Sequence, residues 1–153
     1  MQVGRPQEIS ILLFTRNKGV DTEVPTHDAC HMTEVETTTS QTVLIVDDDE
    51  EIRHVLRLLC ETEGMEVIGE AATGVEAVPQ ALRHQPDVVI LDYMLPRLDG
   101  EGTAEILRAV VPGTKIVAFS AILDSQPGWA DAYLNKERIS ELMPLLQTLI
   151  PNN

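Results

Sequence analysis

Aromatic residues are scarce in this chain. Phe, Trp and Tyr make up 3% of its 153 residues, although 43% of the residues are hydrophobic. A core with so few rings must consist mainly of aliphatic side chains, which is typical of an α/β domain. The length favours one such domain, because most domains contain about 100–200 residues.

Cysteines and long apolar runs are scarce as well. Cys30 and Cys60 are the two cysteines, too few and too widely separated for a disulfide framework, so we expect free thiols and a reducing compartment. The apolar run from Ile9 to Phe14 is interrupted by Ser10. It is too short for a membrane span and weak as a signal peptide. These features predict a cytoplasmic protein without membrane insertion.

Basic residues are few compared with acidic ones. Lys and Arg number 11 against 25 Asp and Glu, which gives a formal net charge of −14. Nucleic acids are bound through clustered Lys and Arg, so this charge argues against direct binding of DNA or RNA. An excess of acidic residues by itself usually indicates a solvated surface.

Residues 1–41 lack the periodic pattern of the rest of the chain. Gly, Pro and a Thr/Ser tract interrupt them repeatedly, and we interpret them as a flexible N-terminal tail that precedes one domain at residues 42–151. Met32 stands shortly before the first expected strand. An alternative is therefore that residues 1–31 come from an upstream start and carry no function.

Several potential metal ligands lie in this tail. His27, Asp28, Cys30 and His31 stand close together in the sequence. Their spacing matches no standard zinc pattern. We therefore favour a flexible polar segment here and keep a metal site as the alternative.

A regular alternation of strand and helix patterns begins at Thr42. The pattern predicts strands at residues 43–46, 66–71, 88–91, 115–119 and 132–134, and helices at 51–63, 74–84, 101–111 and 139–150. Pro79 should kink the second helix or delay its start. Because right-handed crossovers make successive strands parallel, the alternation predicts an α/β fold with a parallel sheet.

Polar residues follow the ends of four of these strands. Asp47 and Asp48 follow the first strand, Asp92 the third, Ser120 the fourth and Lys136 the fifth. The carboxyl ends of parallel strands meet at one edge of the sheet, so we expect these side chains to lie together. Crowded carboxylates repel one another, and a divalent cation would relieve this repulsion. Mg²⁺ fits best, because it takes oxygen ligands and keeps positions for water and phosphate oxygens. The Ser120 hydroxyl and the Lys136 ammonium would complete a site for a phosphate.

Four segments together resemble the receiver domain of two-component response regulators of the single-domain type. They are VLIVDDDEEIR at 43–53, VVILDYMLPRLDG at 88–100, VAFSA at 117–121 and YLNK at 133–136. The resemblance covers about residues 42–150. It implies a flavodoxin-like fold, with a five-stranded parallel sheet and helices on both faces.

The resemblance also assigns the metal ligands. It makes Asp92 the phosphoacceptor, and it implies that Mg²⁺ is bound by Asp47, Asp48, Asp92 and the carbonyl of Met94. The phosphoryl donor would be a sensor histidine kinase or a histidine phosphotransfer protein. A carboxylate is already ionised near neutral pH, so no general base is needed for its attack on phosphorus.

Further roles are implied for residues near the ends of the last two strands. Ser120 and Lys136 would bind the phosphoryl group, and Ser120 with Tyr133 would form the switch that responds to it. Met94 and Ile122 resemble positions that control water access, and both are bulky and apolar here. We therefore expect a long-lived phosphoryl group and no turnover of a separate substrate.

Two features depart from the family pattern. The segment between Ser120 and Lys136 is short by roughly one and a half helical turns, which predicts a shortened fourth helix, either a loop or a single turn, with Trp129 over the sheet. Glu137 stands where the family commonly has proline. A cis peptide is therefore not expected there. The sequence leaves open the direction in which the Lys136 side chain points.

Three functions are compatible with a carboxylate at the end of a buried strand. With nothing after the last helix, a stand-alone receiver would signal by a conformational change to an unidentified downstream protein or relay its phosphoryl group. A phosphohydrolase with an Asp nucleophile needs a second acid at the position that Met94 occupies. A pseudo-receiver that binds partners without phosphorylation is the alternative that the short segment and Glu137 suggest, although the retained polar positions speak against it.

Deletion of residues 1–31 should leave the melting temperature unchanged, because this segment offers no periodic apolar face for burial. Thermal unfolding of the full chain and of the shortened chain, followed by circular dichroism, tests this. A clear drop on deletion would show that the segment packs on the domain, for instance through Ile11 to Phe14.

Overall fold

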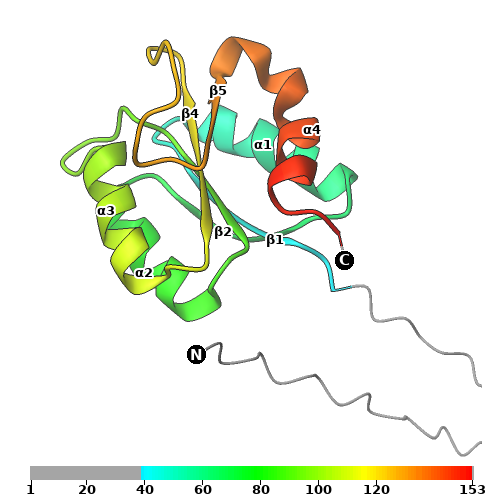
Figure 1. The fold of residues 1–153 in the computed structure, drawn as a ribbon, viewed down its shortest axis with the longest axis horizontal. Coiled ribbons are helices and arrows are strands. Elements are labelled where there is room, and N and C mark those ends of the chain that lie inside the picture. Colours follow the sequence, from blue (N-terminus) through cyan, green and yellow to red (C-terminus); the bar gives the residue numbers. More distant parts are fainter. Residues whose placement is uncertain (1–38, 153) are drawn as a thin grey trace, which may run out of the picture. The chain divides into compact units, whose positions relative to one another are not determined.

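The computed structural model describes residues 39–152. Along this part of the chain (Figure 1) the elements are β1 (Thr42–Val46), α1 (Glu50–Thr62), β2 (Glu66–Ala71), α2 (Gly74–His84), β3 (Val88–Leu91), α3 (Gly100–Val110), β4 (Lys115–Ser120), β5 (Ala132–Asn135), a 3₁₀ helix (Lys136–Glu141) and α4 (Leu142–Leu149). None of these helices has the length and apolar character needed to cross a membrane. The potential metal ligands near His27 lie outside the described residues, as does Cys30.

The five strands form one parallel sheet in the order β2-β1-β3-β4-β5. Helices α1 and α4 cover one face, and α2 and α3 cover the other, as Figure 1 shows. The chain adds β2 on one side of β1 and then β3, β4 and β5 on the other side, so the direction in which strands are added reverses at β1. The predicted flavodoxin-like class of α/β fold is confirmed.

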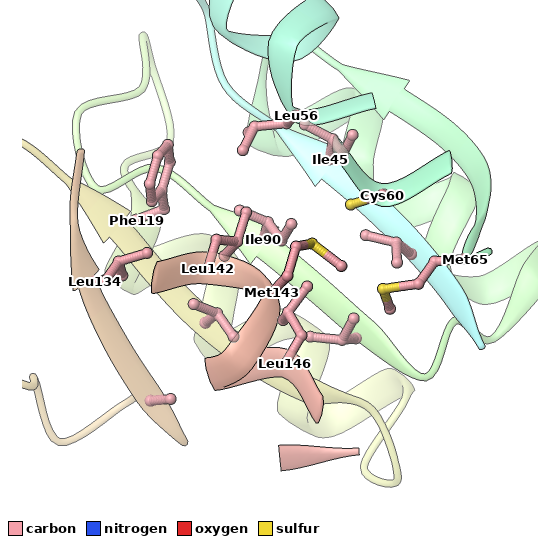
Figure 2. Close-up of a cluster of buried hydrophobic side chains, with 14 residues drawn as sticks. Ile45, Leu56, Cys60, Met65, Ile90, Phe119, Leu134, Leu142, Met143 and Leu146 are labelled. Atoms are coloured by element: carbon pink, nitrogen blue, oxygen red, sulfur yellow. The ribbon is translucent and has the colours of Figure 1, made fainter. Parts of the chain in front are cut away.

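Alternation along the strands divides the core into two clusters. The cluster in Figure 2 lies under α1 and α4 and combines strand residues such as Ile45, Ile90 and Phe119 with helix residues such as Leu56 and Leu142. Phe119 supplies a buried aromatic ring, while most of its neighbours are aliphatic. This composition agrees with the low aromatic content.

The second cluster lies under α2 and α3 and uses the alternate strand positions. Leu44 and Leu91 pack here against small helix residues such as Ala77, Ala81 and Ala104. These alanines are fully buried, so the helices pack on the sheet through small side chains.

The chain between β4 and β5, residues 121–131, contains no helix. The loop alternative for the shortened fourth helix is therefore confirmed. Arg108 of α3 fixes the end of this loop, since its Nη2 donates to Oδ2 of Asp131 at 2.7 Å and to the carbonyl of Trp129 at 3.2 Å. Trp129 packs against the second cluster and stacks on Tyr93, with ring centroids 6.3 Å apart.

Helix α2 has the predicted bounds, and the last helix differs from the prediction. Pro79 lies inside α2 but does not delay its start at Gly74, where Thr73 caps the first turn by accepting from the backbone N–H of Glu76. In place of the single helix expected at 139–150, a 3₁₀ helix (Lys136–Glu141) precedes α4 (Leu142–Leu149). Arg138 has non-helical dihedral angles (φ −102°, ψ 31°) inside the 3₁₀ helix.

Gly100 brings the start of α3 against the end of β3. Its N–H donates to the carbonyl of Tyr93 at 2.9 Å. A Cβ atom at this position would lie 2.5 Å from the carbonyl oxygen of Asp92 and 2.7 Å from Cα of Tyr93. Both atoms belong to the backbone and cannot move aside as the end of a flexible side chain would. A glycine here therefore permits the backbone around Asp92 to take its position.

Gly100→Ala should destabilise the protein by roughly 1–3 kcal/mol, because the added methyl group forces the backbone at Asp92 to shift. Gly113→Ala is the matched control, since nothing lies within 4 Å of its added Cβ. Urea unfolding of both variants measures the difference. Equal stabilities would show that the close approach at Gly100 is tolerated.

Candidate functional site

The polar residues that follow β1, β3, β4 and β5 meet at one edge of the sheet. Sheet pairing continues one residue past the strands at this edge: the N–H of Asp47 donates to Ala71 at 3.0 Å, and the N–H of Asp92 donates to Val46 at 2.9 Å. The backbone of both aspartates is therefore fixed by the sheet. Their positions do not depend on a mobile loop.

Three carboxylates gather at this edge. One oxygen from each of Asp47, Asp48 and Asp92 lies within 4.8 Å of the others. Asp47 and Asp92 are buried, with exposed fractions of 1% and 4%, whereas Asp48 is exposed to solvent. The group therefore combines two desolvated charges with one that solvent can reach.

Lys136 reaches into this group from the end of β5. Its ammonium donates to Oδ2 of Asp92 at 3.0 Å. It also lies 2.6 Å from Oδ2 of Asp47, outside hydrogen-bond geometry, so that contact is an ion pair. No cis peptide bond occurs in the described residues, so Lys136 points into the site with a trans bond to Glu137.

Burial and charge shift the pKa values of this pair. Burial raises the pKa of the Asp92 carboxyl, and the charge of Asp47 raises it further, while the hydrogen bond from Lys136 opposes both effects. Burial lowers the pKa of the Lys136 ammonium, but its contacts with the two carboxylates outweigh this and leave the pKa raised. Lys136 is therefore a permanent cation at neutral pH.

The donor set fits a divalent cation that binds oxygen. Three carboxylates face one ammonium, so negative charge is in excess. Oδ2 of Asp47 is buried and has the Lys136 ammonium, 2.6 Å away, as its positive partner. This one ammonium is shared with Asp92. Mg²⁺ suits such a site because it needs only one or two carboxylates and otherwise binds water and phosphate oxygens.

Met94 and Ile122 lie at the surface, 59% and 56% exposed. The N–H of Met94 donates to Oδ1 of Asp92 at 3.3 Å, which orients the carboxylate. The predicted roles of these two residues in metal binding and water access stay predictions.

Ser120 and Tyr133 both contact the loop between β4 and β5. The buried Ser120 hydroxyl accepts from the N–H of Ile122 at 3.3 Å. The Tyr133 hydroxyl donates to the carbonyl of Leu123. The two predicted switch residues therefore hold the first part of the same loop, at residues 122 and 123.

Sequence reasoning missed several supporting residues. The side chain of Asp49 caps α1 by accepting from the N–H groups of Glu51 and Ile52. Arg53 contacts the backbone of Asp47. An acidic residue followed by a charged helical start is a cap pattern, and Arg53 lies one turn beyond it.

The fold and this acidic edge with its lysine define a response regulator receiver. The chain belongs to the response regulator receiver domain family, whose model matches residues 43–135. This match includes the predicted phosphoacceptor and switch positions and ends immediately before Lys136.

The chain is similar to parts of larger regulators. The transcriptional regulatory protein PdtaR of Mycobacterium tuberculosis is 36% identical over 124 residues, which cover 77% of this chain and 60% of that protein. A protein-glutamate methylesterase/protein-glutamine glutaminase of Hahella chejuensis is 44% identical over 79 residues, covering 52% of this chain and 22% of that protein. The chain therefore spans less than two thirds of the length of these relatives.

Solved receiver structures share the fold. The response regulator TrrA of Thermotoga maritima, crystallised in complex with Mg²⁺ and BeF, is 30% identical with a TM-score of 0.66, and the match covers 72% of this chain and 99% of that one. A putative response regulator from Chloroflexus aurantiacus is 31% identical with a TM-score of 0.66, covering 72% and 97%.

Asp48→Ala should weaken Mg²⁺ binding by about tenfold or more, because it removes an oxygen ligand from the predicted site. Asp49→Ala should leave Mg²⁺ binding intact and instead cost about 1 kcal/mol of stability through loss of the α1 cap. The emission of Trp129, which stacks on Tyr93 beside Asp92, can report the titration. Equal losses of affinity would show that the acidic pair is wrongly assigned.

Proposed function

We propose that this receiver accepts a phosphoryl group on Asp92 from the phosphohistidine of a sensor histidine kinase or of a histidine phosphotransfer protein. The observation that carries the proposal is the meeting of Asp47, Asp48 and Asp92 within 4.8 Å, with the Lys136 ammonium 3.0 Å from Asp92. This arrangement offers a nucleophile, ligands for a divalent cation and a fixed positive charge at one edge of the sheet.

An oxygen of Asp92 would form the new bond to phosphorus. The P–N bond breaks as this bond forms, and its electron pair returns to the imidazole of the donor. The hydrogen bonds from Lys136 and from the N–H of Met94 hold the carboxylate in place for the in-line approach. No side chain has to remove a proton, because the attacking group is a carboxylate.

The remaining polar residues would bind the transferred group. Lys136 lies between Asp47 and Asp92 and supplies positive charge to the phosphoryl oxygens. Ser120, buried at the end of β4, would donate its hydroxyl to one of them. Asp47, Asp48, Asp92 and the Met94 carbonyl would hold Mg²⁺, which when bound offsets negative charge on the phosphoryl group.

Ser120 and Tyr133 would pass the change onward. The Ser120 hydroxyl now accepts from the N–H of Ile122. Its own proton would be donated to the phosphoryl group, which would draw this side chain, and with it the start of the loop, toward Asp92. Tyr133 is hydrogen-bonded to Leu123 in the same loop, so its ring would move with that loop.

The signal would then reach a downstream protein as a conformational change, or the phosphoryl group would be relayed. The chain would act in signalling in the cytoplasm rather than as an enzyme on a separate substrate.

A pseudo-receiver that binds partners without phosphorylation is the second candidate. The observation that favours it is the loop at residues 121–131, which contains no helix and so changes the surface available for output. The site itself retains the aspartates, Ser120 and Lys136 that phosphorylation would need. Phosphorylation is therefore the experiment that separates the two functions.

Incubation of the full chain with Mg²⁺ and acetyl phosphate should add one phosphoryl group, seen by intact-mass measurement. Asp92→Asn should abolish the addition. Asp99→Asn is the matched control, because it changes a nearby acidic residue that caps α3 and Asn is an equally good cap. A folded wild type that gains no phosphoryl group with any donor would favour the pseudo-receiver.

A further inference from the structure

Arg53 is a cation placed against the acidic edge, although the proposed chemistry gives it no role. It lies in the second turn of α1, and its side chain is 16% exposed. Its Nη1 donates to the backbone carbonyl of Asp47 at 2.7 Å. Such a charge-assisted hydrogen bond is short and strongly oriented.

If the Arg53 guanidinium acted only through its electric field, it should repel a cation bound by Asp47, Asp48 and Asp92. Glu70 on β2 reduces this effect, with Oε1 lying 3.9 Å from Nε of Arg53. Arg57, one turn further along α1, binds Oε2 of the same Glu70 through Nε and Nη2, at 3.0 and 2.7 Å. Arg53 and Arg57 thus share one acidic partner, but Arg53 alone of the two also contacts Asp47.

The turn after β1 is held mainly through the polar groups of Asp47. The N–H of Asp47 donates to Ala71, and its Oδ1 accepts from the N–H of Asp49 at 2.9 Å. The Asp49 side chain in turn caps α1. The Asp47 carbonyl, which belongs to the peptide group that joins Asp47 to Asp48, is held by Arg53.

The Asp48 carboxylate depends on this peptide for its position. Within residues 39–152 no hydrogen bond holds the Asp48 side chain, and it is exposed to solvent, yet its oxygen lies within 4.8 Å of those of Asp47 and Asp92. Rotation of the Asp47–Asp48 peptide would therefore move this carboxylate away from the other two.

We propose that Arg53 is a positioning residue for the metal site, which fixes the Asp47–Asp48 peptide so that the Asp48 carboxylate faces Asp47 and Asp92. The inference rests on the proposed function, because it concerns the same Mg²⁺ site. Glu70 offsets the charge of Arg53, so that the site gains the hydrogen bond with less electrostatic repulsion.

Positioning and charge predict opposite results when Arg53 is replaced. Removal of a positive charge near a cation site should tighten Mg²⁺ binding if the field of Arg53 dominates. Loss of the hydrogen bond to Asp47 should weaken binding if positioning dominates. Substitution of a residue that orients a metal ligand typically lowers metal affinity by about 10–100-fold.

The test is calorimetric titration of Mg²⁺ into the full-length wild type, Arg53→Met, Arg53→Lys and Arg57→Met. Arg53→Met should raise the Kd about tenfold or more. Arg53→Lys, which keeps the charge and a donor, should recover part of the loss. Arg57→Met should bind Mg²⁺ like the wild type, because it loses contact with Glu70 but none with Asp47.

Melting temperatures without metal separate positioning from general destabilisation. If Arg53→Met does not fold, the folded Arg53→Lys variant carries the test, and its Kd must exceed that of the wild type. Wild-type or tighter binding by the Arg53 variants, or an equal loss in Arg57→Met, would overturn the inference and leave the proposed function standing. A folded wild type that binds no Mg²⁺ would overturn the metal site together with the inference.

Discussion

Two carboxylates buried at the edge of the sheet are the constraint on which the rest of the site depends. Asp47 and Asp92 follow neighbouring strands, and a single ammonium from Lys136 lies against both. Buried charges are tolerated only when they are paired. Removal of Lys136 would leave two like charges desolvated beside each other. The ion pairs of Lys136 with Asp47 and Asp92 therefore link the ends of β1, β3 and β5, and they also orient the proposed phosphoacceptor.

The sheet makes this arrangement possible by its rigidity. Strands β1 and β3 are apolar on both faces, and their residues enter separate clusters above and below. Polar side chains can therefore stand only where the strands end. Because the backbone of Asp47 and Asp92 is still hydrogen-bonded to adjacent strands, the carboxylates are placed before any ligand arrives, which lowers the cost of binding.

The loop at residues 121–131 takes the place of the fourth helix that the family resemblance implies, so the surface beside β5 is formed by a loop. In place of a helix, Arg108 and Asp131 fix the end of the loop, and Trp129 covers the second cluster and stacks on Tyr93. The start of the loop is bonded to Ser120 and Tyr133. A firmly held end and a start bonded to the two proposed switch residues would let a change at Asp92 alter the loop locally, without disturbing the core.

The sequence by itself determined the order of the strands and helices and the residues at the site edge. Short β-branched runs that end in Asp or Ser indicate parallel strands with polar ends, so Asp47, Asp92 and Ser120 could be placed together before any coordinates. The tertiary structure decided what depends on contacts between distant segments. It decided where the Lys136 side chain points, how Arg108 anchors Trp129, and that Arg53 contacts Asp47. These features depend on side-chain directions and packing, which a one-dimensional pattern of apolar and polar residues does not contain.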